Sequence, residues 1–356
     1  MHNDWHIFLE TRGARLDAAG VMHFAAAPRE AACAPLDLST LGILAVGGAD
    51  AGDFLQRQVS NDLRELTHEH SHLSSHCNAK GRVVATFQVL RVADDFWLFL
   101  PRSQLAELHA RLRRYVLQAQ VSFADLSDDW VCLGLLGEDA VAPLRAQCGT
   151  PPARAHDVFQ APEFRLVRMP GAVPRWLFVG SAPLACQLWT DVSALAPPAN
   201  ADLWALHDIR AGLPTVYPAT RELFVPQMLN LHLIDGVSFH KGCYIGQEVV
   251  ARMQYLGKLK RRMYWAEVDA VPLPQPGTAL GSVDAQSAQG PGTVVDARYN
   301  AAGRCELLIV ADIAAVARGT LRLGEDGPFL QPCPPPYGFP TPDTAEHVAD
   351  AANDGD

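Results

Sequence analysis

The chain has 356 residues, of which 49% are hydrophobic and 19% are charged, and its formal net charge is −10. This composition is typical of a globular protein with two or three packed domains, and it excludes a collagen-like or intrinsically disordered chain. No run approaches the roughly eighteen apolar residues that span a membrane, and the N-terminus lacks a basic start followed by an apolar stretch. We therefore expect a cytoplasmic protein without a membrane partner.

The first predicted elements follow each other closely. The apolar run 41–47 predicts a buried strand, and Asp50 then begins a helix with apolar residues at helical spacing. Strands are predicted at 83–90 and 96–100, an amphipathic helix from Ser103, and another strand at 121–124.

The next segment has the order strand, helix, strand, strand, helix, which predicts a separate split β-α-β subdomain. Its ranges are 130–136, 139–147, 164–168, 175–179 and 183–192. After an Ala/Pro linker, residues 201–211 predict a helix that Gly212 terminates. Short strands between 263 and 323 indicate a small barrel or sandwich, and the Pro-rich, acidic residues 331–356 predict a disordered tail.

The cysteines and the charges limit the kinds of site. All eight cysteines stand singly, which predicts reduced thiols and no self-contained metal or iron-sulfur site. The acidic balance disfavours direct nucleic-acid binding, because phosphate contacts need clustered Lys and Arg. Residues 331–356 hold five acids and no Lys or Arg, whereas 241–262 hold six basic residues against Glu248 alone. This basic segment could attract an anionic ligand or could be a solvated strand end.

Two polar segments precede the strand at 83–90. The histidines at 68, 70, 72 and 76 could ligate a metal, but no second ligand cluster accompanies them, so an exposed polar segment is favoured. The loop 76–82 contains Asn, Lys, Gly and Arg, and it is either a plain hairpin turn or a set of donors for a carboxylate or a heterocycle.

Three further residues could recognise a flat heterocycle. Trp204 lies on the predicted helix 201–211, where an aromatic side chain belongs either to the core or to a stacking surface. The amides of Gln227 and Asn230 present paired donor and acceptor edges, which a pterin ring also displays.

The segment Lys-Gly-Cys-Tyr-Ile-Gly-Gln-Glu at 241–248 has the most unusual composition in the chain. A neighbouring ammonium favours the thiolate, which is the reactive form of cysteine, so Lys241 could activate Cys243. The glycines at 242 and 246 allow a tight turn. The alternative is a loop whose cysteine is only a small apolar residue.

These segments, in this order, resemble the folate-binding YgfZ family, a branch of the superfamily that includes the glycine-cleavage T-protein. The resemblance covers about residues 36–330 and is most specific in the string at 241–248. Its other segments are 60–62, 76–82, 209–214, 224–227 with Asn230, and the remainder of 237–252.

The resemblance implies an α+β fold, a GcvT-like three-domain ring with a central folate cavity. A discontinuous folate-binding domain would comprise residues 36–127 and 200–258. Residues 128–196 would form the inserted split β-α-β subdomain, and residues 259–330 the C-terminal β-barrel.

The resemblance also implies a function. The family acts in assembly or repair of iron-sulfur clusters in client enzymes, such as a radical enzyme that methylthiolates tRNA, so its effect on tRNA is indirect. The implied cofactor is tetrahydrofolate or a derivative, and a monomeric accessory factor is favoured over a turnover enzyme. Cys243, with Lys241, would carry the reactive function. Residues expected to bind or position folate are Trp204, Leu41, Asn61, Asp62, Lys80, Arg210, Gln227, Asn230 and Glu248.

Two positions depart from the related patterns. Leu41 stands where a bacterial member has a second folate-contacting tryptophan. Arg210 stands where T-proteins place a pterin-binding glutamate, and an arginine cannot accept the pterin's N–H groups, although it could pair with a glutamate tail. A folate-dependent aminomethyltransferase is therefore the less favoured alternative, and a folate-binding scaffold without chemistry is a third.

Overall fold

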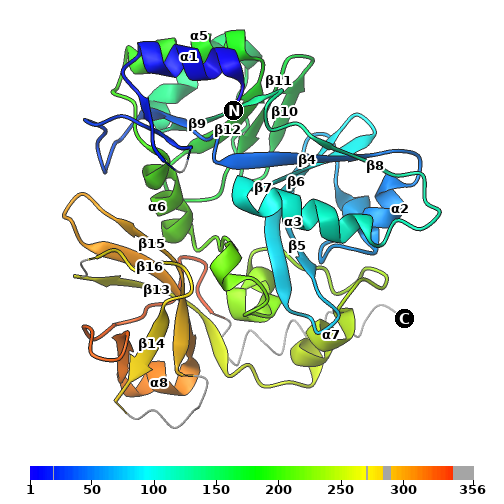
Figure 1. Cartoon of the computed structure of the whole chain (residues 1–356), viewed down its shortest axis with the longest axis vertical. Helices are drawn as coiled ribbons and strands as arrows, with labels where there is room; N and C mark the ends of the chain where they lie inside the picture. Colours follow the sequence, from blue (N-terminus) through cyan, green and yellow to red (C-terminus); the bar gives the residue numbers. More distant parts are fainter. Residues whose placement is uncertain (19, 270–271, 284–289, 340–356) are drawn as a thin grey trace.

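The computed structural model describes residues 1–18, 20–269, 272–283 and 290–339. It contains three five-stranded sheets whose strands pair in antiparallel fashion. Each sheet belongs to one part of the molecule, and helix α6 (Ala201–Ala211) lies where these three parts meet (Figure 1). The predicted α+β class is confirmed. Within the described residues, no helix is long and apolar enough to cross a membrane.

The first sheet has the strand order β5-β6-β7-β4-β8 and carries two helices. Leu105, Leu108 and Leu112 of the longer helix are buried, as the amphipathic pattern predicts. The bounds are β4 Leu41–Gly47, α2 Ala51–Gln56, η1 Leu63–Glu65, β5 His72–Cys77, β6 Val83–Val92, β7 Asp95–Pro101, α3 Arg102–Arg113 and β8 Ser122–Asp125. All but β5 and η1 were predicted from the sequence.

Strand β5 corrects the expectation of an exposed polar segment, because His72 and His76 are buried. Its polar side chains find partners inside the protein: Ser75 Oγ lies 2.9 Å from Ser60 Oγ, and His76 Nδ1 lies 2.9 Å from the carbonyl oxygen of Gln58. The predicted hairpin turn at 76–82 joins β5 to β6. A strand that buries hydrogen-bonded Ser and His has no apolar period by which the sequence could reveal it.

Burial lowers the pKa of His76 from 6.5 to about 4. The unfolded chain therefore binds more protons than the folded chain between these two values, and stability should fall as the pH drops from about 6.5 to about 4. Between pH 7 and pH 4.5, the unfolding free energy of the wild type should fall by about 2 kcal/mol more than that of His76→Asn, as measured by urea unfolding. His68→Asn, at an exposed position, should leave the wild-type loss unchanged.

The second sheet has the order β10-β11-β12-β9-β3 and belongs to the predicted subdomain. Strand β3 adds to this subdomain a segment from the N-terminal part of the chain. Helix α1 (Asn3–Thr11) packs on α5, where the rings of Trp5 and Trp189 lie 5.4 Å apart. Strand β3 pairs with β9, so residues 36 and 37 belong to this sheet and not to the first. The remaining bounds are β1 Arg15–Leu16, β2 Met22–His23, β3 Ala34–Asp37, β9 Val131–Leu136, η2 Glu138–Ala140, α4 Val141–Cys148, β10 Val158–Ala161, β11 Phe164–Arg168, β12 Arg175–Gly180 and α5 Ala182–Ser193.

The third sheet has the order β13-β16-β15-β14-β17, and it is curled into a half-barrel at the position of the predicted C-terminal β-barrel (Figure 1). Its bounds are β13 Arg261–Val268, β14 Ala279–Ser282, β15 Gly292–Tyr299, β16 Cys305–Asp312, α8 Ile313–Arg318 and β17 Leu321–Leu323.

The predicted disordered tail differs from the structure at its start. Cys333 exchanges two backbone hydrogen bonds with Trp265, and Phe339 contacts Tyr264 with ring centroids 5.3 Å apart. Residues 331–339 therefore form part of the folded domain. The sequence has no apolar run there, and the segment is held by backbone pairing and aromatic contacts. Residues 340–356 lie outside the described residues.

Helix α6 ends as predicted, at Gly212 with a φ of 69°. The chain then passes through short turns of 3-10 helix to α7, which lies at the edge of the molecule beside the turn between β5 and β6 (Figure 1). These elements are η3 Pro218–Thr220, η4 Pro226–Leu229, η5 Leu231–Leu233 and α7 Gln247–Tyr255.

Candidate functional site

A cavity of about 770 Å³ lies between α6, the first sheet and the β1-β2 hairpin. Apolar side chains form much of its wall, including Leu41, Phe99 and Leu177, and polar groups such as Gln88 and Ser103 are distributed among them. A mostly apolar cavity of this size with a few polar groups is typical of a site for a small organic ligand.

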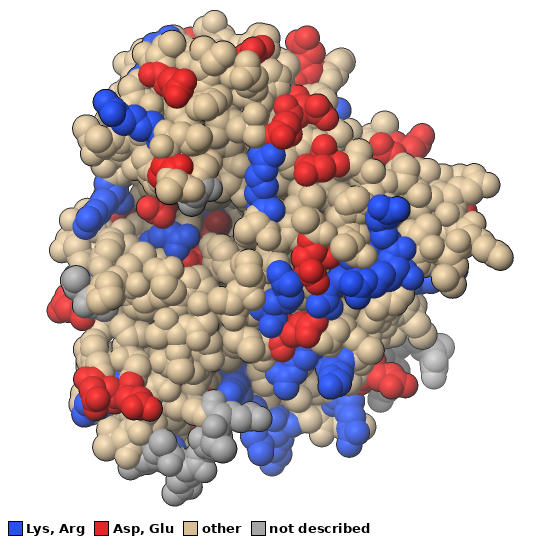
Figure 2. Space-filling model, in the orientation of Figure 1, with Lys and Arg blue, Asp and Glu red and all other residues tan. Residues whose placement is uncertain are grey.

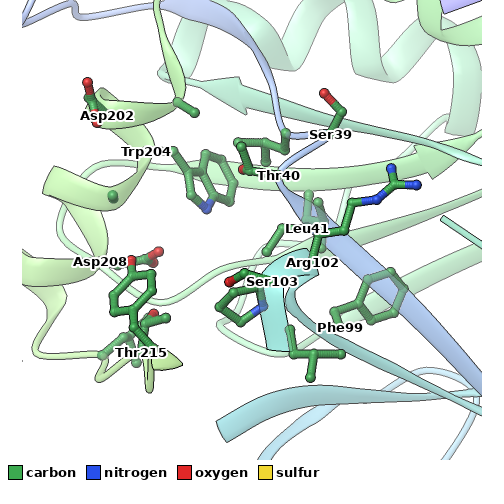
Figure 3. Close-up of a pocket in the computed structure, with 18 of the residues that line it drawn as sticks. Ser39, Thr40, Leu41, Phe99, Arg102, Ser103, Asp202, Trp204, Asp208 and Thr215 are labelled. Atoms are coloured by element: carbon green, nitrogen blue, oxygen red, sulfur yellow. The ribbon is translucent and has the colours of Figure 1, made fainter. Parts of the chain in front are cut away.

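Trp204 and Leu41, two predicted site residues, line this cavity from opposite sides (Figure 3). Trp204 is 6% exposed, and the nitrogen-bearing edge of its indole ring faces the cavity (Figure 3). Among the described residues, none accepts a hydrogen bond from its Nε1. Trp204 therefore offers the cavity an aromatic surface and a free donor.

Arg175, at the start of β12, holds this wall in place and was not predicted as a site residue. Its side chain is fully buried, and its guanidinium lies 4.8 Å from the centre of the Trp204 ring. Nη1 donates to the backbone oxygen of Trp204, and both Nε and Nη2 donate to that of Pro170. Arg175 thus fixes Trp204 through its ring and its backbone.

Asp208, one turn after Trp204 on α6, also faces the cavity and was likewise missed (Figure 3). Its Oδ1 accepts a hydrogen bond of 2.6 Å from Arg175 Nη2, whereas Oδ2 has no donor within the described part of the chain. Burial raises the pKa of Asp208, and the neighbouring Arg175 opposes that rise. The i, i+4 spacing of Trp204 and Asp208 on a predicted helix was the only sequence signal that could have paired them.

The N-terminal hairpin forms part of the cavity wall. Asp17, Val21 and His23 line it from β1-β2, and Asp202 of α6 pairs with Arg298 of β15 at a distance of 3.1 Å. Sequence reasoning assigned no role to residues 1–35, because the hairpin is short and carries no motif.

Arg210 is placed outside the lining of this cavity. Its guanidinium pairs with Glu306 at 2.7 Å and also contacts Glu30, so its N–H groups already donate to two carboxylates. These partners raise the pKa of Arg210 and lower that of Glu30. The expected pairing of Arg210 with a folate glutamate tail stays a prediction, and it would compete with two internal carboxylates.

Four other predicted folate contacts hold segments of the protein together, outside the cavity lining. Asn61 Nδ2 donates to the backbone oxygens of Leu73 and Asp235, and Asp62 accepts from Gln56 and Arg64. Gln227 Nε2 donates to the backbone oxygen of Val250, and Asn230 Nδ2 to that of Met263. Gln227 Oε1 and Asn230 Oδ1 are buried without a partner among the described residues. Their contact with folate stays a prediction.

Cys243 and Lys241, the predicted reactive pair, lie in different environments. Cys243 is exposed and does not line the cavity, whereas Lys241 is only 5% exposed. Lys241 Nζ donates to the backbone oxygens of Val59 and Asn61, at 2.7 Å each. Burial lowers the pKa of Lys241 to about 7. Lys241 is therefore an anchor that fixes the segment to the residues before β5, and activation of the thiol by this ammonium stays a prediction.

The turn that presents Cys243 packs on the predicted loop at 76–82. Gly246 has a φ of 82°, and a Cβ built on it would lie 2.4 Å from the backbone oxygen of Asn78. A Cβ built on Gly81 in that loop would lie 2.9 Å from Cβ of Val249 in α7. Lys80, at the tip of the loop, and Glu248, in the first turn of α7, are exposed beside this junction and outside the cavity lining. Two of the segments that carry the family resemblance thus lie against each other.

Gly246→Ala should be strongly destabilising, because alanine is strained at this positive φ and its methyl group would clash with backbone atoms. We expect a loss of at least about 2 kcal/mol in unfolding free energy, measured by urea denaturation. Gly242→Ala is the matched control in the same segment, since no atom lies within 4 Å of its added Cβ. An equal effect of the two substitutions would contradict this account of the turn.

Metal ligands do not gather in the described residues: no group of three or more His, Cys, Asp or Glu side chains there could hold a metal ion. His72 and His76, which the sequence raised as candidate ligands, lie on the buried face of β5.

Comparison with known proteins agrees with the architecture. The family model of the GCVT N-terminal domain matches residues 21–183. The glycine cleavage system aminomethyltransferase T from Bartonella henselae has a similar solved structure, with a TM-score of 0.71 over 93% of this chain and 95% of that one. Its sequence is only 16% identical, so this likeness shows the fold alone. The expected GcvT-like fold is confirmed.

Curated relatives have a higher sequence identity with this chain than that solved structure has. A tRNA-modifying protein YgfZ from Serratia proteamaculans is 32% identical over 295 residues, which cover 82% of this chain and 89% of the relative. A tRNA-modifying protein YgfZ from Escherichia coli is 30% identical over 315 residues, covering 88% and 96%. Identity at this level over nearly the whole of both chains shows the relationship that the 241–248 segment suggested, and the protein belongs to the YgfZ family.

Proposed function

We propose that this protein binds tetrahydrofolate, or a derivative of it, in the central cavity and acts in assembly or repair of iron-sulfur clusters of client enzymes. Its support of tRNA methylthiolation would then be indirect, through a client such as a tRNA methylthiotransferase. The observation that carries the proposal is the wall formed by Trp204 and Asp208, which combines an aromatic surface, a free donor and a free carboxylate oxygen.

The residues present suit a folate. Trp204 would contact the flat pterin ring, and Asp208 Oδ2 would accept from pterin N–H groups, the task that Arg210 cannot perform. Leu41 would contribute apolar contact in place of a second aromatic ring. Tetrahydrofolate, when bound, carries one-carbon units on its nitrogen atoms. Within the protein, Arg175 would keep Trp204 and Asp208 oriented for binding.

Cys243 would act outside the cavity, on a client's cluster or thiol. Its exposure on a turn fixed by Lys241 and Gly246 supports a role in which the other half of the site belongs to a partner. An iron-sulfur cluster takes about four thiolate ligands, so one exposed cysteine suits a transient contact better than a resident cluster.

The test is made in a bacterial strain that lacks its own YgfZ-family gene. Expression of this chain should restore methylthiolated tRNA and the activity of the iron-sulfur methylthiotransferase to the level given by the strain's own gene. Failure to restore either, with the protein present at normal abundance, would refute the proposal.

The aminomethyltransferase alternative has its own assay. It requires sustained formation of methylenetetrahydrofolate from tetrahydrofolate and an aminomethylated lipoyl protein, and we expect no turnover above a reaction without the protein. Catalytic turnover would replace the accessory function by this enzyme activity.

A further inference from the structure

We propose that α7 and its flanks form the docking face for an acidic partner protein, with Cys243 at the edge of that face. The inference rests on the proposed function and deepens it by naming the surface that receives the partner and the partner's surface chemistry.

Helix α7 turns large apolar side chains outward. Of its nine residues only Val250 is buried, while Tyr255 is 60% exposed and Leu256, directly after the helix, is 84% exposed. Val249, in the first turn of the helix, is also exposed. Exposed apolar residues gathered on one short element mark an interaction site more often than isolated ones do.

Basic side chains surround these apolar residues. Arg252 on α7, Lys258 and Lys260 just after it, and Lys80 on the adjoining turn are all exposed. None of the four forms an ion pair with another described residue, and Glu248 is the only acid between 243 and 262. Figure 2 shows Lys and Arg gathered on the lower right of the molecule, where α7 lies in Figure 1.

The face therefore combines an apolar centre with a positive border. Its complement is a protein surface with an apolar patch bordered by Asp and Glu, since opposite charges steer association and the apolar contact supplies affinity. A nucleic-acid backbone would match the charges but would leave the aliphatic side chains without a partner.

The thiol lies within reach of such a partner. Cys243 is three residues before Gly246, which caps a helix about 14 Å long. A standard interface covers about 800 Å² on each protein, which is enough to span α7 and reach Cys243. A partner seated on α7 would thus bring its own groups to the exposed thiol.

A triple substitution, Leu256→Asp with Lys258→Glu and Lys260→Glu, tests the face in the strain that lacks its YgfZ-family gene. We expect at least a tenfold loss of methylthiotransferase support. The purified variant should keep the wild-type unfolding midpoint, tetrahydrofolate affinity and rate of Cys243 alkylation by iodoacetamide. The matched control, Leu195→Asp with Arg145→Glu and Arg154→Glu, makes the same charge change at exposed positions of the second-sheet domain and should keep wild-type support. Wild-type support by the α7 variant would overturn the inference, whereas absent support by the wild type would refute the proposed function instead.

A second measurement identifies the occupant. A photoreactive benzoylphenylalanine in place of Leu256 should cross-link in cells to an iron-sulfur protein, and Lys258→Glu with Lys260→Glu should abolish the product. A product of twice the chain's mass would assign the face to a second copy. An internal cross-link that disappears on removal of residues 340–356 would assign it to the chain's own acidic segment. Each of these, a nucleic-acid adduct, or no product would overturn the inference.

Discussion

Cys243→Ser should abolish the protein's support of iron-sulfur methylthiotransferase activity while leaving the protein folded. The thiol is exposed and outside the cavity, so its loss should change neither stability nor folate binding. A serine hydroxyl is a poor nucleophile and a poor ligand for iron, because the reactive group is a thiolate. The measurement is the level of methylthiolated tRNA in the strain that lacks its YgfZ-family gene.

Cys333→Ser provides the control, since Cys333 is the other exposed cysteine and its fixed role is a backbone pairing with Trp265. It should retain full support. Normal methylthiolation with Cys243→Ser would remove the thiol from the function and would favour a folate-binding scaffold without chemistry.

Arg175→Leu should lower the unfolding free energy by about 3 kcal/mol, because it removes a fully buried guanidinium, leaves the backbone oxygens of Pro170 and Trp204 without its hydrogen bonds, and takes the ion-pair partner from the partly buried Asp208. The pKa of Asp208 should rise further in this variant, since burial raises it and Arg175 opposes that rise. The substitution also removes the groups that hold Trp204, so tetrahydrofolate affinity should fall together with stability. Urea unfolding and a folate titration measure the two effects.

A double substitution separates the ion pair from simple loss of packing. Arg175→Leu combined with Asp208→Asn should be at least about 1 kcal/mol more stable than the sum of the two single effects predicts, because no unpaired charge remains. Strict additivity would show that Arg175 and Asp208 do not act as a unit.

The sequence revealed elements that have strong apolar periods and short turns. Strand β4, helices α3 and α6, and the antiparallel pair β6 and β7 follow from such patterns. Strand β5 could not be found in this way, because its buried side chains are Ser and His whose partners lie elsewhere in the chain. The placement of α1 against α5 is a long-range contact that no local pattern encodes.

The site was predictable only in part, for a similar reason. The sequence motifs indicated Trp204 and Cys243 as site residues. They did not show which side chains from other segments would contact these two residues. Lys241 begins the segment that carries the thiol, yet its long side chain enters the protein to reach two backbone oxygens. Arg175 and Asp208 come from distant segments and meet only when β12 packs on α6, so their charge pair becomes visible in the fold.

Titration calorimetry of tetrahydrofolate with the purified wild type and with Trp204→Ala tests the folate cavity most directly. We predict one folate per chain for the wild type and at least a tenfold weaker affinity for Trp204→Ala, equal to about 1.4 kcal/mol of lost binding free energy. Circular dichroism should confirm that the variant is folded. Absence of binding by the wild type, or equal affinity of the two folded proteins, would contradict the assignment of this cavity to folate.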